Sequence, residues 1–284
     1  MKLKLPYNLR GNQKEIIDSI EATLKNRNHI VLESPTGSGK TFTSLAATLP
    51  FVINKDLKIV YCVRTNSQQK QVIHELEQFK KAGNPIKAVA IQGRDSLCPQ
   101  QNYDEELKKS NWAEKSKICK SLKMQSKMGE GGCQFYRGFL RDSKSLIDSW
   151  STEILTAQDF SKKAEEAGLC PYELNKLLLK DAQIVIVPYV YFFEEFVRNY
   201  VLGWMGTSID KVITIIDEAH NLPDWARGAA SDSLSLKSIN RAVNEVKDYG
   251  YLLPEGRDPI QFLNFVEASI EKLAEEHILD NEDE

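Results

Sequence analysis

Five short runs of apolar, mostly β-branched residues recur along the chain, and they constrain its fold more than any other feature. A strand that is buried on both faces shows near-continuous apolarity, whereas a half-exposed strand alternates. Helical periodicity precedes the first run, as in Ile16, Ile20 and Leu24. It also follows the second run, as in Val72, Ile73 and Leu76. We therefore predict an α/β fold with a parallel, doubly wound sheet. The runs span residues 29–32, 58–63, 87–91, 183–187 and 211–216.

The composition is that of a globular protein. Hydrophobic residues make up 42% of the 284 residues, which is enough for a sizeable core and about two domains. The net charge of −3 excludes a uniformly basic, histone-like protein but leaves room for a local basic patch. Neither a secretory signal nor a run of roughly 18 apolar residues for a membrane span is present, so we expect an intracellular protein, cytoplasmic or, in a eukaryote, nuclear.

The strand pattern stops between about Asp95 and Leu178, where charged helical sequence with four cysteines takes its place. A structureless connection of that length is improbable inside a compact domain, so we predict a separate small insertion. Beyond Asp232 only helical sequence follows. The predicted boundaries are 1–94 and 179–233 for the two parts of the α/β domain, 95–178 for the insertion and 234–284 for a helical segment.

The segment from Ser34 to Thr41 follows the first apolar run and precedes an apolar helix. Its glycines let backbone N–H groups face phosphate oxygens, while Lys40 reaches the β- and γ-phosphates and Thr41 can bind Mg²⁺. Ser34 stands where the usual motif has a glycine. The pattern predicts an ATP site, and its residues are Ser34, Gly37, Ser38, Gly39, Lys40 and Thr41.

Asp217 and Glu218 follow the last apolar run, at the carboxyl end of a predicted strand. The first carboxylate would bind the same Mg²⁺ as Thr41, and the second would orient the attacking water. His220 would then be placed to sense the γ-phosphate. An acidic helix N-terminus that only favours the helix dipole is the alternative. Together with the phosphate loop, the pattern favours ATP hydrolysis, with Lys40, Asp217, Glu218 and His220 as catalytic residues.

These segments resemble the motifs of superfamily 2 helicases of DEAH type. Residues 34–41 resemble motif I, 63–66 motif Ia and 217–220 motif II. Residues 10–13 resemble the adenine-reading element, which implies cofactor contacts from Arg10 and Gln13, whereas an ordinary surface position for Gln13 is the alternative.

The four cysteines of the insertion are Cys98, Cys119, Cys133 and Cys170, and no two of them form a close pair. Their spacing alone leaves three readings open, which are a zinc site, an iron–sulfur site and unrelated buried thiols. An odd total of five cysteines without a secretion signal argues against a disulfide framework. The fifth, Cys62, lies in an apolar run and is expected to be a buried thiol without a metal.

The residues around these cysteines resemble the XPD family, which includes the FancJ and DinG helicases. The similar segments are 93–98, 133–136 and 168–172, and the whole resemblance covers about residues 8 to 235. It implies a RecA-like domain with an inserted domain that holds a four-iron four-sulfur (4Fe–4S) cluster on the four cysteines.

The resemblance also implies an activity, that of an ATP-dependent DNA helicase of 5′-to-3′ polarity that acts in repair. The residues from about 234 onward would begin a helical arch, and the chain would be the N-terminal portion of such a helicase, without its second RecA-like domain. The sequence does not identify protein partners in a repair complex. The alternatives are an ATP- and single-strand-binding module without significant catalysis, and a metal-stabilised P-loop protein unrelated to nucleic acid.

Charge supports a role for the insertion in binding single-stranded DNA. Residues 107–144 contain ten Lys and Arg against three acidic residues, interleaved with aromatic rings. Cationic side chains bind phosphates and aromatic side chains stack on unstacked bases, so this combination suits single-stranded DNA. The alternative is an ordinary basic helix face that is exposed to solvent. The candidate nucleic-acid contacts are Arg64, Thr65, Arg94, Tyr136 and Tyr191, and for Tyr191 a core position is an equal alternative.

Overall fold

The computed structural model describes residues 2–35, 37–54, 57–231, 234–252 and 258–279. It consists of two compact units, which are residues 1–219 and residues 220–284. In the described part of the chain, no helix is long and apolar enough to cross a membrane.

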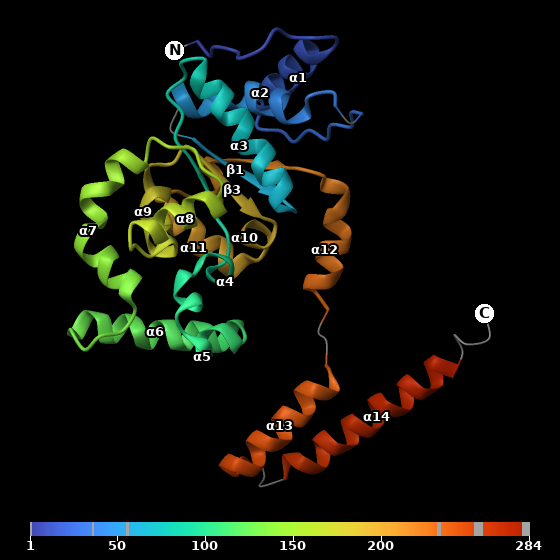
Figure 1. Ribbon diagram of the computed structural model, residues 1–284. Helices are drawn as coiled ribbons and strands as arrows, with labels where there is room; N and C mark the ends of the chain where they lie inside the picture. Colours follow the sequence, from blue (N-terminus) through green and yellow to red (C-terminus); the bar gives the residue numbers. More distant parts are fainter. Residues whose placement is uncertain (1, 36, 55–56, 232–233, 253–257, 280–284) are drawn as a thin grey trace. The chain divides into compact units, whose positions relative to one another are not determined.

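A parallel sheet of four strands forms the centre of the first unit (Figure 1). The strands are β1 (Lys58–Val63), β2 (Ala88–Ala90), β3 (Ile184–Pro188) and β4 (Val212–Ile216), in the spatial order β2-β3-β1-β4. Val60 in the central strand lies opposite Val185 of β3 and Thr214 of β4. Because β1 and β3 are covered on both faces, their side chains are almost fully buried. The predicted α/β class with a parallel sheet is confirmed.

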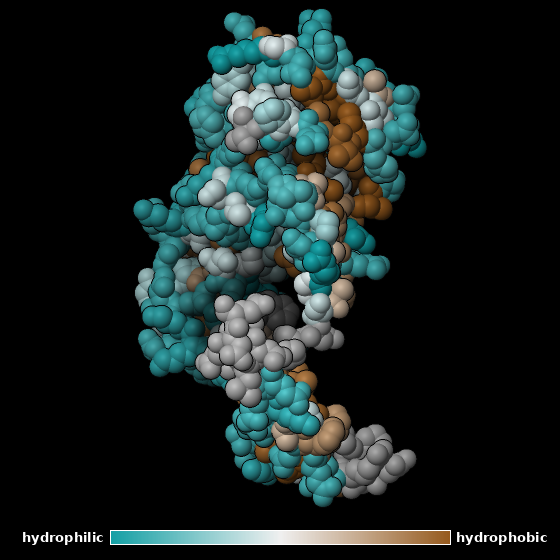
Figure 2. Space-filling view, turned by 90° about the vertical axis from the view of Figure 1, so that its right-hand side faces the viewer, coloured by the Kyte–Doolittle hydropathy of each residue, from teal (hydrophilic) through white to brown (hydrophobic). Residues whose placement is uncertain are grey.

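The strand predicted at residues 29–32 is wrong. These residues have no strand structure, and Val31 is 94% exposed. An apolar run becomes a strand only where a neighbouring strand offers hydrogen bonds, and no described strand pairs with this run or with the outer edge of β4. Figure 2 shows a continuous hydrophobic band on one side of the molecule. The exposed run 30–32 and the half-buried β4 are two apolar segments of the first unit.

Three helices pack together beside the sheet (Figure 1), namely α1 (Gln13–Lys25), α2 (Lys40–Asn54) and α3 (Asn66–Lys81). Their contact is an apolar core in which Leu45 and Leu76 are fully buried. The rings of Phe42 in α2 and Phe79 in α3 stack at 5.5 Å. This packing fixes the start of α2, where the predicted phosphate loop ends.

All elements between β2 and β3 in the described structure are helical, as the charged pattern predicts. They have their own apolar cluster around Trp150, Phe160 and Leu174. They also contact the helices beside the sheet, since the backbone N–H of Ala157 donates to the side chain of Gln69 in α3. The elements are α4 (Arg94–Leu97), η1 (Pro99–Asn102), α5 (Glu105–Lys109), α6 (Trp112–Met128), α7 (Gln134–Trp150), α8 (Ala157–Glu166) and α9 (Pro171–Asp181).

Three short elements lie between β3 and β4, which are α10 (Val190–Phe193), α11 (Glu195–Met205) and η2 (Ile209–Lys211). After β4 come η3 (Ala219–Asn221) and the helices of the second unit, α12 (Leu222–Ala229), α13 (Leu236–Tyr249) and α14 (Pro259–Leu279). The helical character predicted beyond Asp232 is therefore confirmed for the described residues.

Candidate functional site

The phosphate loop lies at the start of α2 and is shaped by two glycines. Gly37 and Gly39 have φ angles of +80° and +84°, in the left-handed region that glycine adopts without strain. The Lys40 ammonium folds back over the loop and donates to the carbonyl oxygens of Ser34 at 2.9 Å and Pro35 at 3.4 Å. The loop thus places a cation where phosphate oxygens could replace these two carbonyls. Thr36 of this motif lies outside the described residues.

Gln13 connects the N-terminal segment to the phosphate loop. Its Nε2 donates to the Ser38 carbonyl at 2.9 Å, and its Oε1 accepts from the Arg10 backbone N–H at 3.0 Å. A Cβ atom added to Gly39 would lie 2.7 Å from the same Nε2, so the two segments are in close contact. The structure therefore places Gln13 at the loop and not on an isolated surface. Contacts of Arg10 and Gln13 with adenine stay a prediction.

The acidic pair lies at the carboxyl end of β4, where the backbone N–H of Asp217 continues the sheet by donating to the Cys62 carbonyl. Glu218 has a φ of +51°, a strained value for a residue with a side chain. The Tyr189 hydroxyl, just after β3, donates to the backbone carbonyls of Asp217 and Glu218, although β1 lies between β3 and β4 in the sheet. Tyr189 is a site residue that the sequence did not single out, because its partners are carbonyls brought near only by the fold.

The loop lysine lies within electrostatic range of Asp217. Burial and the neighbouring Glu218 carboxylate raise the pKa of Asp217, and the Lys40 ammonium acts in the opposite direction. Thr41 is buried, and its side chain interacts with the Tyr61 hydroxyl of β1. A hydroxyl and a carboxylate are ligand types that Mg²⁺ accepts.

His220 is placed differently from the rest of the predicted catalytic set. It is the first residue of the second compact unit, and its Nε2 lies 3.0 Å from the side-chain amide of Asn221. Its predicted role at the γ-phosphate stays a prediction.

The four insertion cysteines lie within electrostatic reach of one another and are all free thiols. Burial, together with the neighbouring Cys119 and Cys133, raises the pKa of Cys98 to about 11. Burial also raises the pKa of Cys170 to about 12, with contributions from Cys133 and Cys98. Residues that are far apart in sequence have therefore been gathered into one cluster of sulfur donors, whereas Cys62 is buried alone in β1.

Three of these cysteines immediately precede helices, and backbone N–H groups of the first turn lower the pKa of their thiols. Such groups favour the thiolate over the thiol, because a helix N-terminus carries partial positive charge. Each of them lowers the pKa against the effect of burial. The donors are Gln100 and Gln101 for Cys98, Phe135 and Tyr136 for Cys133, and Glu173 for Cys170.

No three His, Cys, Asp or Glu side chains in the described parts of the chain are arranged to hold a metal ion. A single ion requires ligands that converge on one point at about 2.3 Å in the case of sulfur. A cluster of several irons bonds each cysteine to a different iron, so it accepts more widely separated sulfur atoms. The nature of any metal at these cysteines stays a prediction.

The candidate nucleic-acid residues of the insertion are largely packed inside it. The Arg94 guanidinium lies 4.7 Å from the centre of the Tyr172 ring and donates to the Ser116 hydroxyl at 3.2 Å. Tyr136 is only 6% exposed, and its ring stacks on Phe139. Tyr136 therefore supports the cysteine cluster from inside and offers little surface to a base.

Residues 64–65 occupy the first turn after β1. The Thr65 hydroxyl accepts from the backbone N–H of Gln68, and the Gln68 side chain accepts from the N–H groups of Arg64 and Thr65. This capping box holds the start of α3. Their predicted contact with a phosphate backbone stays a prediction.

The parallel sheet, the glycine loop before α2 and the acidic pair after β4 define a RecA-like P-loop domain. A family model described as DEAD_2 matches residues 61–239, which is more than half of the chain. The chain belongs to this family, and its place among the XPD-type superfamily 2 helicases, predicted from the motifs, is confirmed.

Known proteins extend this similarity. The chain is 27% identical to a protein from Arabidopsis thaliana named regulator of telomere elongation helicase 1 homolog, over 92% of this chain, and 26% identical to the Caenorhabditis elegans protein of that name, over 87%. It spans 27% of the length of each. Two solved structures share the fold at 22% identity, a truncated XPD (TM-score 0.55, 91% of this chain and 65% of that one) and an XPD helicase (TM-score 0.53, 84% and 37%).

Proposed function

We propose that this chain binds Mg-ATP and single-stranded DNA as the ATP-binding part of a helicase motor of 5′-to-3′ polarity that acts in DNA repair inside the cell. The observation that carries the proposal is the Lys40 ammonium, which lies on the carbonyls of the glycine loop and within electrostatic range of Asp217 at the end of β4. Lys40 would leave the carbonyls of Ser34 and Pro35 for the β- and γ-phosphates of ATP, and Thr41 and Asp217 would bind Mg²⁺. Glu218 would orient the attacking water.

A fluorescent ATP analogue tests the site directly. Lys40→Ala should abolish its binding, whereas Lys25→Ala, which removes an exposed lysine of α1, should leave the affinity unchanged. Equal affinities in the two variants would contradict the phosphate-loop assignment. Binding of ATP without hydrolysis stimulated by single-stranded DNA would instead support a binding module.

We also propose that Cys98, Cys119, Cys133 and Cys170 bind a four-iron four-sulfur cluster as thiolates. The donor set supports this group, because Cys170 packs against the apolar cluster that contains Cys133, and Cys98 and Cys119 lie within electrostatic range of Cys133. When bound, the cluster would join α4, α6, α7 and α9 and so contribute to the folding free energy of the insertion.

Metal analysis of protein purified without oxygen tests this assignment. We expect iron and sulfide in equal amounts and a brown colour that is lost when any of the four cysteines is changed to Ser. Cys62→Ala should keep the colour, because Cys62 lies in β1 and away from the cluster. Stoichiometric zinc without iron would contradict the proposal.

A further inference from the structure

Three aromatic residues form a ladder on one side of α11. Phe196, Tyr200 and Trp204 are four residues apart, so their side chains lie on the same face of the helix. The ring centres of Phe196 and Tyr200 are 5.0 Å apart, and those of Tyr200 and Trp204 are 6.2 Å apart. Phe196 is 68% exposed and Tyr200 52% exposed, so these rings contribute little to the core.

The ladder continues onto α9 and gains positive charge there. The Trp204 ring meets Tyr172 of α9 edge to face at 6.2 Å. The Lys176 ammonium lies 4.4 Å from the centre of the Tyr172 ring and 4.9 Å from that of Trp204. Arg94 approaches Tyr172 as well. Rings and cations therefore alternate at the Trp204 end of the ladder.

Exposed rings beside cationic side chains favour single-stranded nucleic acid as the ligand of this face. Unstacked bases bind exposed rings through their faces, while neighbouring cations bind the phosphates. The rings of Phe196 and Tyr200 meet edge to face at 83°, and those of Tyr200 and Trp204 are tilted by 33°, so bases would stack on the exposed outer faces of the rings and not between them. Glu194 and Glu195 precede Phe196, whereas at the Trp204 end Lys176 and Lys123 share the single carboxylate of Glu173, so phosphates are favoured there.

We infer that Trp204, Tyr200 and Phe196 form a stacking track that carries single-stranded nucleic acid along α11, with its phosphates received by Lys176 at one end. The inference rests on the proposed function and assigns part of the strand's path to α11. This helix lies outside the basic segment 107–144 that the sequence favours.

Binding of labelled oligothymidylates of increasing length, measured by fluorescence anisotropy at several salt concentrations, tests the track. Tyr200→Ala should weaken the binding of long oligonucleotides about five- to a hundredfold with an unchanged salt slope, because it removes a ring and no charge. Tyr200→Phe should bind like the wild type. Lys176→Gln should instead reduce the log-log salt slope by about 1. The loss in Phe196→Ala should be smaller than in Tyr200→Ala.

Tyr249→Ala is the matched control, since it removes an exposed tyrosine ring from the second unit. Wild-type affinity of Tyr200→Ala at every length, while Lys176→Gln still lowers the slope, would overturn the track and leave the proposed function intact. Absence of any binding by the wild type would contradict the DNA-binding part of the proposed function and the track together. A change in sedimentation of Tyr200→Ala, with unchanged DNA binding, would show that the rings mediate self-association and would also overturn the inference.

Discussion

Glu75 in α3 carries a carboxyl group whose ionisation opposes folding. Burial raises its pKa, and one of its oxygen atoms, Oε2, has no hydrogen-bond partner in the described structure. A carboxyl group with a raised pKa in the folded state contributes stability at low pH and loses it as the pH rises through that pKa. Glu75→Gln should therefore increase the free energy of unfolding at pH 8. The increase should shrink toward pH 4, because Glu75 is then largely protonated in both states.

Urea unfolding of both proteins at the two pH values measures this effect. Glu77→Gln, a neighbouring change on α3, serves as the control. A difference between wild type and Glu75→Gln that is the same at pH 4 and pH 8 would show that the carboxyl group is not responsible.

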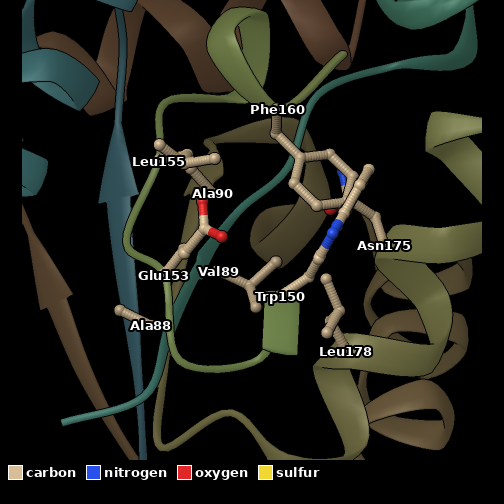
Figure 3. A pocket seen from close by; sticks show the side chains of 9 residues that line it. All are labelled: Ala88, Val89, Ala90, Trp150, Glu153, Leu155, Phe160, Asn175 and Leu178. Atoms are coloured by element: carbon tan, nitrogen blue, oxygen red, sulfur yellow. The ribbon is translucent and has the colours of Figure 1, made fainter. Parts of the chain in front are cut away.

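Asn175 of α9 is a buried polar residue that we expect to destabilise the fold. It is 4% exposed, and neither its side-chain oxygen nor its nitrogen has a partner in the described structure. Figure 3 shows its amide beside the rings of Trp150 and Phe160, in a cavity with room for about one water molecule. Asn175→Leu should raise the free energy of unfolding by about 1 kcal/mol, because it removes an unsatisfied amide of similar size.

Asn84 provides the matched comparison for this prediction. It is equally buried, but its amide donates to the carbonyls of Lys4 and Phe79 and accepts from the Lys4 backbone N–H. Asn84→Leu should therefore lower the free energy of unfolding by roughly 2–3 kcal/mol, since these groups lose their partner. If Asn175→Leu destabilises the protein as much, Asn175 is bonded to a retained water.

At the scale of elements, Gly138 sets how closely α7 approaches the turn before α9. A Cβ atom at this position would lie 2.1 Å from the backbone carbonyl oxygen of Gly168. Since this contact is with backbone, α7 would have to move. Gly138→Ala should lower the free energy of unfolding of the first unit by about 1–3 kcal/mol, as overpacked sites do.

Gly203 of α11 is the control for this change, because a Cβ atom there meets nothing within 4 Å. Gly203→Ala should stabilise the protein by about 0.5–1 kcal/mol through helix propensity alone. Thermal unfolding of the two variants tests the pair. Stabilisation by both would show that α7 does not pack closely against the Gly168 turn.

The same scale explains what the sequence predicts well and what it does not. Continuous apolarity identifies β1 and β3 because both are covered by strands and helices on all sides. The run at 29–32 has the same composition, but strand formation depends on a neighbour that the pattern does not contain. The loop at Ser34–Thr41 and the pair Asp217 and Glu218 are local motifs. Tyr189 and the helix-terminal positions of the cysteines depend on topology, so the sequence does not reveal them.

Across the whole molecule, burial is distributed unevenly between the two units. Strand β1 has five of its six residues buried, whereas the buried residues of α13 are Ile239 and Val243. Segments with few buried apolar contacts open locally at a low free energy. Amide hydrogen exchange should therefore be much faster in α13 and α14 than in β1 and β3. Equal protection of the two units would contradict this difference.

The hydrogen bonds of Tyr189 also join two sites that serve different ligands in the proposal. Its hydroxyl is bonded to the carbonyls of the acidic pair, and two residues further along the chain Tyr191 lines a cavity together with Tyr172 and Trp204. Any movement of the Asp217 carbonyl must either break its bond with Tyr189 or displace the segment that carries both tyrosines. The end of β3 thus links the backbone of the acidic pair to the lining of the cavity beside Tyr172 and Trp204.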